Sequence, residues 1–77
     1  MTINMYHGDH APPHLHVRMA SFRAKFALPS LALIEGRLPP TALGMVEDWG
    51  ELHRDELMAN WDRVESGEAL QRIAPME

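Results

Sequence analysis

The chain has 77 residues, no cysteine and a formal net charge of −4. A chain of this length buries only about 60% of the surface that it exposes when unfolded, so we expect a single domain over residues 1–77. Without disulfides, its stability must come from packing, a metal ion or a homo-oligomer. The negative charge excludes a protein whose whole surface binds nucleic acid, but it leaves a local basic face open.

The N-terminus has no cationic start followed by a long apolar run, and no stretch of the sequence approaches the roughly 18 apolar residues of a membrane span. The absence of cysteine also fits a reducing compartment. We therefore expect a cytoplasmic protein without a signal peptide or a membrane helix.

The first short strand is predicted over Thr2 to Tyr6, before the turn-forming residues Gly8 and Asp9. Next, Pro12 and Pro13 fix an extended segment, because each proline restricts its own backbone and that of the residue before it. This segment leads directly into a second strand that begins at His14.

From Leu15 to Leu28 the apolar residues fit a β-hairpin with Ala20 and Ser21 at its turn. Since side chains alternate across a strand, this register places one set of residues on the core face: Leu15, Val17, Met19, Phe22, Ala24 and Phe26. The same register pairs the residues of the opposite face: Arg18 with Arg23, His16 with Lys25, and His14 with Ala27. Imidazoles and cations are thus predicted to share one surface.

The rest of the chain predicts one more short strand and a helix. The strand covers Leu31 to Glu35, and the helix begins near Pro40, where proline is tolerated in a first turn. Apolar residues then recur at intervals of three and four as far as Val64. Glycine at positions 44 and 50 weakens a helix, so a kinked helix or two shorter helices meeting near His53 form the alternative.

The fold class predicted by these elements is α+β. We expect a small antiparallel sheet of three to four strands packed against a long C-terminal amphipathic helix. On that helix, His53 lies in the apolar stripe, where a histidine is more often a packed and hydrogen-bonded residue than a catalyst.

The least expected feature of the composition is the set of four histidines within ten residues, at positions 7, 10, 14 and 16. His14 and His16 would project from the same face of a strand, and His10 or Asp9 would complete a divalent-metal site. Against this interpretation, Lys25 and Arg18 add positive charge nearby, and Asp9 is the only acid in the segment. We therefore expect neither a bound metal nor another cofactor.

The cationic face needs an explanation of its own, because like charges that oppose each other across strands destabilise a sheet. Three anions would relieve the repulsion: RNA phosphate, an acidic segment of a partner protein, or this chain's own helix acids, which are Glu47, Asp48, Glu51, Asp55 and Glu56. A simply solvated strand face is the remaining alternative. The residues expected to bind the ligand are His10, Arg18, Arg23 and Lys25.

If the ligand is RNA, His14 and His16 are the expected catalytic pair. Two nearby imidazoles can share the general base and general acid roles in cleavage by the 2'-hydroxyl, while the neighbouring cations stabilise the charged phosphorane. Whether the protein is an enzyme is left open by the sequence, which contains no phosphate-binding glycine loop, serine elbow or nucleotide fingerprint.

Three segments resemble a family known only as domain of unknown function 4160. They are Met5 to His16, which contains D-H-x-P-P-H-x-H, then Leu33 to Pro39, and Trp49 to Leu57 with Asn60 and Trp61 after it. Members are small single-domain proteins, often encoded beside another small protein as in toxin–antitoxin pairs. The resemblance implies a partner from a neighbouring gene, but no established reaction.

The function expected from these observations is that of a component of a toxin–antitoxin-like two-gene module. It would bind RNA or an acidic partner segment through the His/Arg/Lys strand face, with ribonuclease activity as an extension. The first alternative is a non-catalytic protein-binding module or antitoxin, and the second is a small divalent-metal-binding protein.

Overall fold

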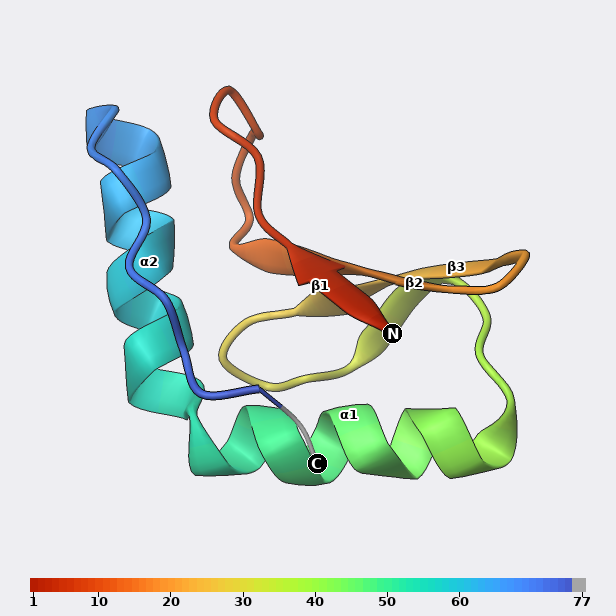
Figure 1. Cartoon of the computed structure of the whole chain (residues 1–77). Helices are drawn as coiled ribbons and strands as arrows, with labels where there is room; N and C mark the ends of the chain where they lie inside the picture. Colours follow the sequence, from red (N-terminus) through yellow and green to blue (C-terminus); the bar gives the residue numbers. More distant parts are fainter. Residues whose placement is uncertain (76–77) are drawn as a thin grey trace.

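The computed structural model describes residues 1–75, which form a four-stranded sheet and two helices (Figure 1). The elements follow in the order β1 (Thr2–Asn4), β2 (His14–Met19), β3 (Phe22–Ala27), β4 (Leu33–Gly36), α1 (Pro40–Leu52) and α2 (Arg54–Ser66). The sheet is antiparallel, and its strands lie in the order β1-β2-β3-β4. The predicted α+β class is therefore confirmed.

The predicted hairpin register is confirmed across both strands. Leu15 pairs with Phe26, Val17 with Ala24, and Arg18 with Arg23. Leu15 and Phe26 are fully buried, so this face of the hairpin belongs to the core. The pattern was sufficient because side chains alternate strictly across a strand, and a slip of one residue would have exposed every apolar side chain.

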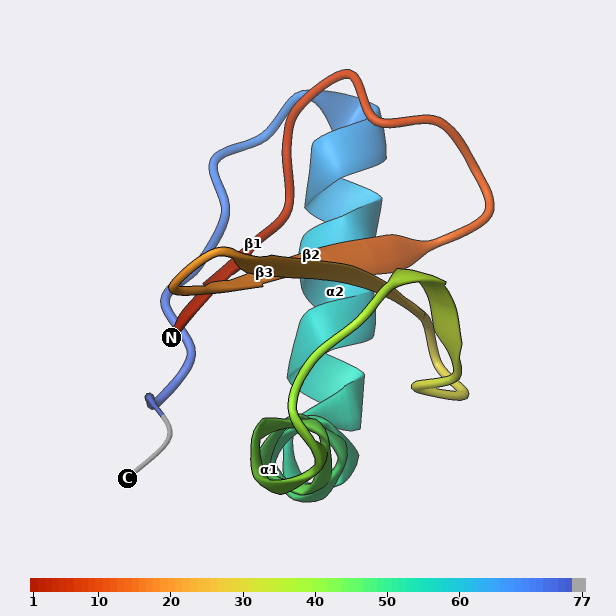
Figure 2. The same ribbon diagram turned by 90° about the vertical axis from the view of Figure 1, so that its right-hand side faces the viewer.

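The core lies between the sheet and α1, which runs beneath one face of the sheet (Figures 1 and 2). Ala42, Val46 and Gly50 recur every four residues along α1 and form its buried stripe. The other face of the sheet is not covered by α1. In Figure 2, the loop between β1 and β2 arches over one end of this open face.

The prediction of one long C-terminal helix is wrong, and the alternative of two helices that meet near His53 describes the structure. His53 is the C-cap of α1 and the N-cap of α2, with φ of −109° and ψ of 21°. Its backbone N–H still donates to Trp49 and its carbonyl accepts from Leu57. The second helix therefore starts at once but in a new direction, and it rises past one end of the sheet (Figure 1).

The change of direction lets α2 bury a face of its own. Leu57, Trp61 and Val64 are between 2% and 5% exposed. A straight continuation of α1 would have carried these side chains away from the sheet. Two acidic residues in the first turn of α2, Asp55 and Glu56, suit the positive end of a helix dipole and stabilise the new start.

Gly50 does not mark the break but a close approach between α1 and the loop before β4. A Cβ at this position would lie 2.7 Å from Cδ2 of Leu31, which is itself buried. Any side chain at this position would therefore have to displace the methyl groups of Leu31. By contrast, a Cβ at Gly44 would meet nothing within 4 Å.

After α2, whose C-cap is Gly67, the chain runs back along the helix towards α1 (Figure 1). Asn60 holds this segment through both atoms of its amide, which bond the backbone N–H and carbonyl of Gln71 at 2.9 Å each. Farther along, Nε1 of Trp49 donates to the carbonyl of Ala74. Residues 68–75 are therefore fixed by main-chain contacts to the two helices.

Neither helix within residues 1–75 combines the length and the apolar character that a membrane crossing requires.

Candidate anion-binding face and histidine cluster

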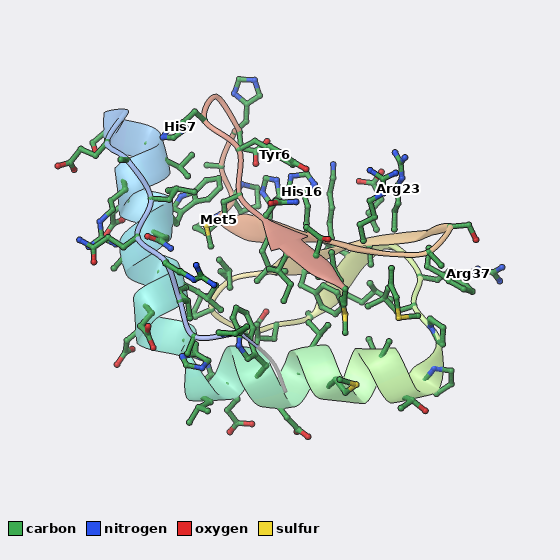
Figure 3. All side chains as sticks on the ribbon, viewed as in Figure 1. Met5, Tyr6, His7, His16, Arg23 and Arg37 are labelled. Atoms are coloured by element: carbon green, nitrogen blue, oxygen red, sulfur yellow. The ribbon has the colours of Figure 1, made fainter. Side chains whose placement is uncertain are left out.

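The open face of the sheet carries two rows of polar side chains that run across its strands. One row contains Asn4, His16, Lys25 and Glu35, one from each strand, and the other contains Thr2, Arg18 and Arg23. Figure 3 shows His16 and Arg23 projecting from the sheet on the side away from α1. The predicted surface of imidazoles and cations therefore exists.

The three cations on this face differ in whether an acidic side chain of residues 1–75 neutralises them. Nζ of Lys25 lies 3.0 Å from Oε2 of Glu35 on the neighbouring strand. Arg18 and Arg23 oppose each other directly, and neither forms an ion pair with any residue of the described chain from 1 to 75. Within residues 1–75, none of the acidic residues of α1 and α2 forms an ion pair with Arg18, Arg23 or Lys25. The two arginines thus leave a concentrated positive charge facing solvent.

A shallow hollow of about 360 Å³ lies between these side chains. Two of the residues that line it, His16 and Arg23, project on the side of the sheet opposite α1 (Figure 3). Its lining comes from all four strands and from the loop after β1: Asn4, Tyr6, His16, Val17, Arg18, Arg23, Ala24, Lys25, Glu35 and Gly36.

Four aromatic rings connect this hollow to α2. Tyr6, which is 52% exposed, meets His16 edge-on at 4.8 Å between ring centroids. His16 meets His14 at 5.0 Å, and His14 lies 5.3 Å from Trp61 on α2. The row therefore begins at an exposed phenol ring and ends at a buried indole.

The two predicted catalytic histidines lie in different environments. The side chain of His14 is only 11% exposed, because its ring lies against Trp61 of α2, whereas the side chain of His16 is 24% exposed and lines the hollow. A ligand on the open face therefore meets the imidazole of His16 before that of His14.

Asp9 approaches both of these histidines. Its Oδ2 lies 3.1 Å from Nε2 of His16 and 3.7 Å from Nε2 of His14. A turn positions it: the backbone N–H of Asp9 donates to the carbonyl of Tyr6, and the N–H of Tyr6 donates back to Oδ2. Gly8 takes φ of +90° within that turn, a conformation in which other residues are strained.

His10, also predicted as a ligand-binding residue, is exposed and lies apart from the open face. It lines a different hollow together with His7 and the end of α2, where Nε2 of His7 lies 2.8 Å from the carbonyl oxygen of Glu68. The structure therefore brings together His14, His16, Arg18, Arg23 and Lys25, but not His10.

His53 also has ordinary structural partners. Its ring lies 5.1 Å from that of Trp49, and its Nδ1 lies 2.6 Å from Oε1 of Glu56. These contacts agree with the expectation of a packed and hydrogen-bonded histidine.

The sequence did not single out three polar side chains that line the hollow: Asn4, Tyr6 and Glu35. The position of Glu35 could have been predicted, because antiparallel pairing of β4 with β3 brings it opposite Lys25. For Tyr6 no periodic signal existed, since it follows the end of β1 and depends on the path of the loop.

The fold and the face define a small α+β protein with an open, partly cationic sheet surface and a histidine cluster at its edge. The model of the family described as domain of unknown function (DUF4160) matches residues 1–62, so the chain belongs to this family. No curated protein and no solved structure matches it.

Proposed function

We propose that this protein binds single-stranded RNA on the open face of its sheet, as the cytoplasmic component of a toxin–antitoxin-like two-gene module. The observation that carries the proposal is the directly opposed pair Arg18 and Arg23, which lack an acidic partner within residues 1–75. An RNA phosphate between the two guanidinium groups would replace repulsion by two charge-assisted contacts.

The exposed ring of Tyr6 favours RNA over an acidic polypeptide. Proteins that bind single strands combine a basic groove with aromatic rings on which bases stack, and such stacking contributes about 1–3 kcal/mol per base. Tyr6 and the cations line the same hollow. A carboxylate-rich segment would use the arginines but would have no specific use for the phenol ring.

The module part of the proposal comes from the family resemblance, which implies a neighbouring gene's product as partner. RNA cleavage by His14 and His16 is a further hypothesis within the same proposal. The burial of His14 argues that His16 makes the first contact with RNA. Binding is therefore the activity to measure first.

The test is fluorescence anisotropy with a short labelled oligouridylate, measured from about 0.05 to 0.2 M salt. Arg18→Glu and Arg23→Glu should each weaken binding, and each should reduce the slope of log K against log salt by about 0.7 per lost phosphate contact. Arg72→Glu makes the same change of charge on the exposed segment after α2 and serves as the matched control. Equal weakening by all three variants would contradict a specific face.

Tyr6→Ala separates RNA from an acidic partner. We expect it to weaken binding of the oligouridylate by about 1–3 kcal/mol, because one base loses its stacking surface. Binding of polyglutamate, which has the charge but no bases, should be unchanged. Tighter binding of polyglutamate or of the neighbouring gene's product, with no binding of RNA, would support the protein-binding alternative instead.

Growth of an expressing host tests the module. Growth arrest that is relieved by co-expression of the neighbouring gene's product, and that is lost in Arg18→Glu, is the expected result. Unimpaired growth with a stable complex of the two products would assign the antitoxin role.

A further inference from the structure

The histidine cluster beside the open face has the ligand types of a metal site. The donor atoms of Asp9, His14 and His16 all lie within 4.8 Å of one another. The ligands of a tetrahedral ion with bonds of about 2.0–2.1 Å lie about 3.3 Å apart. Oδ2 of Asp9 lies 3.1 Å from Nε2 of His16, from which it accepts a hydrogen bond, and 3.7 Å from Nε2 of His14. Both distances are close to the ligand spacing, and a bound ion would take the place of the Nε2 proton of His16.

The hydrogen bonding of His14 prepares it as a ligand. Its Nδ1 lies 2.8 Å from the carbonyl oxygen of Pro12, so Nδ1 must carry the proton and donate it. In the neutral ring the lone pair is then on Nε2, the atom that faces Asp9. Metal-binding histidines almost always donate their second ring nitrogen to a carbonyl or carboxylate in this way, which fixes both tautomer and orientation.

Packing holds the three ligands in place. The ring of His14 lies against Trp61, and the exposed fractions of the side chains of His14, His16 and Asp9 are 11%, 24% and 20%. Asp9 is fixed by the turn that begins at Tyr6. Ordering these side chains for a metal would therefore cost little conformational entropy.

The local charges also permit a cation. The sequence-based objection to a metal was the positive charge of Lys25 and Arg18 without a nearby carboxylate. In the structure the carboxylate of Asp9 lies 3.1 Å from Nε2 of His16, and Lys25 is paired with Glu35 at 3.0 Å. Arg18 follows His16 by two residues on the same face, but it is exposed, so solvent and salt screen its charge. The objection therefore no longer holds.

We infer that Asp9, His14 and His16 bind one divalent transition-metal ion of the zinc class. Two imidazoles and one carboxylate suit zinc and its neighbours, and the absence of thiolate ligands from the chain argues against softer ions. Three protein ligands leave at least one coordination position open, as in sites that bind a small ligand rather than in closed structural sites. This inference does not depend on RNA binding.

Isothermal titration calorimetry with Zn²⁺ and the visible absorption of bound Co²⁺ test the site. Both measurements use the full chain without a histidine tag. We expect one ion per chain. Asparagine has the shape of aspartate, and the side chain of His16 reaches the surface, so the variants Asp9→Asn and His16→Gln should both fold. Each should lower the affinity more than about 100-fold, which is the upper end of the loss caused by removing an outer hydrogen bond alone.

His10→Gln is the matched control, because it removes an exposed histidine from the same loop and should leave the affinity within about twofold. Arg18→Glu, which tests the RNA-binding face, should not weaken the metal affinity either. Failure of the RNA proposal would therefore leave this result intact.

A measurement on the unaltered protein guards against variants that fail to fold. In ¹H–¹⁵N spectra of the imidazoles, Zn²⁺ should shift Nε2 of His14 and His16 and leave His7 and His53 unchanged. No stoichiometric binding, equal losses from His10→Gln and His16→Gln, or ring shifts confined to other histidines would each overturn the inference.

Discussion

The two faces of the β2–β3 hairpin share one backbone but have opposite environments. On the core face, the cross-strand neighbours Leu15 and Phe26 are fully buried. On the open face, the neighbours Arg18 and Arg23 are exposed. One period-two pattern therefore encodes both the fold and the candidate binding surface, so substitutions of adjacent residues should affect different properties.

The largest expected difference is between Phe26→Ala and Arg23→Ala. The first removes a fully buried ring from the core and should destabilise the protein by about 3–5 kcal/mol. The second shortens an exposed side chain on the same strand and should leave the free energy of unfolding almost unchanged. Urea unfolding followed by circular dichroism measures both, and comparable losses would contradict the division between the faces.

A smaller effect is expected on the helix that covers the core face. Gly50→Ala forces a Cβ against Leu31 and should destabilise by about 1–3 kcal/mol through overpacking. Gly44→Ala, in the same helix with free space around it, should stabilise by up to about 1 kcal/mol through helix propensity. Opposite shifts in melting temperature are the expected result. A rise in both variants would show that helix propensity outweighs the contact, and a fall in both would contradict the free space at Gly44.

The smallest effect on stability is expected from Arg18→Glu on the open face. Reversal of one charge replaces repulsion of Arg23 by attraction, so stability should rise slightly, by less than about 1 kcal/mol. Binding of RNA should fall in the same variant, as described above. Loss of folding together with binding would show that the face is structural.

The sequence predicted local geometry well and long-range contacts poorly. The hairpin register followed from alternation alone, although its turn has Ala20 at φ of +51° in place of the usual glycine. The break between the two helices was predicted only as an alternative. The sequence alone does not show whether Gly50 breaks the helix or makes room for Leu31, because Leu31 belongs to a distant loop. The burial of His14 was not foreseen, since it depends on Trp61 of α2.

The residues of the candidate site were likewise predicted where they lie on the hairpin, but not where they lie in the loop before it. Arg18, Arg23, Lys25 and His16 were placed correctly on one surface because they belong to the hairpin. Asp9 reaches the histidines through a turn whose geometry no periodicity encodes, so its distance from His16 could not be derived.

The segment after α2 is held by side chains that bond its main chain. Asn60 bonds the N–H and carbonyl of Gln71, Trp49 bonds the carbonyl of Ala74, and His7 lies within hydrogen-bonding distance of the carbonyl of Glu68. Asn60 and Trp49 lie inside the region matched by the family model, whereas the segment lies beyond it. Because main-chain atoms are the same in every residue except proline, these contacts specify where the segment runs without specifying its sequence.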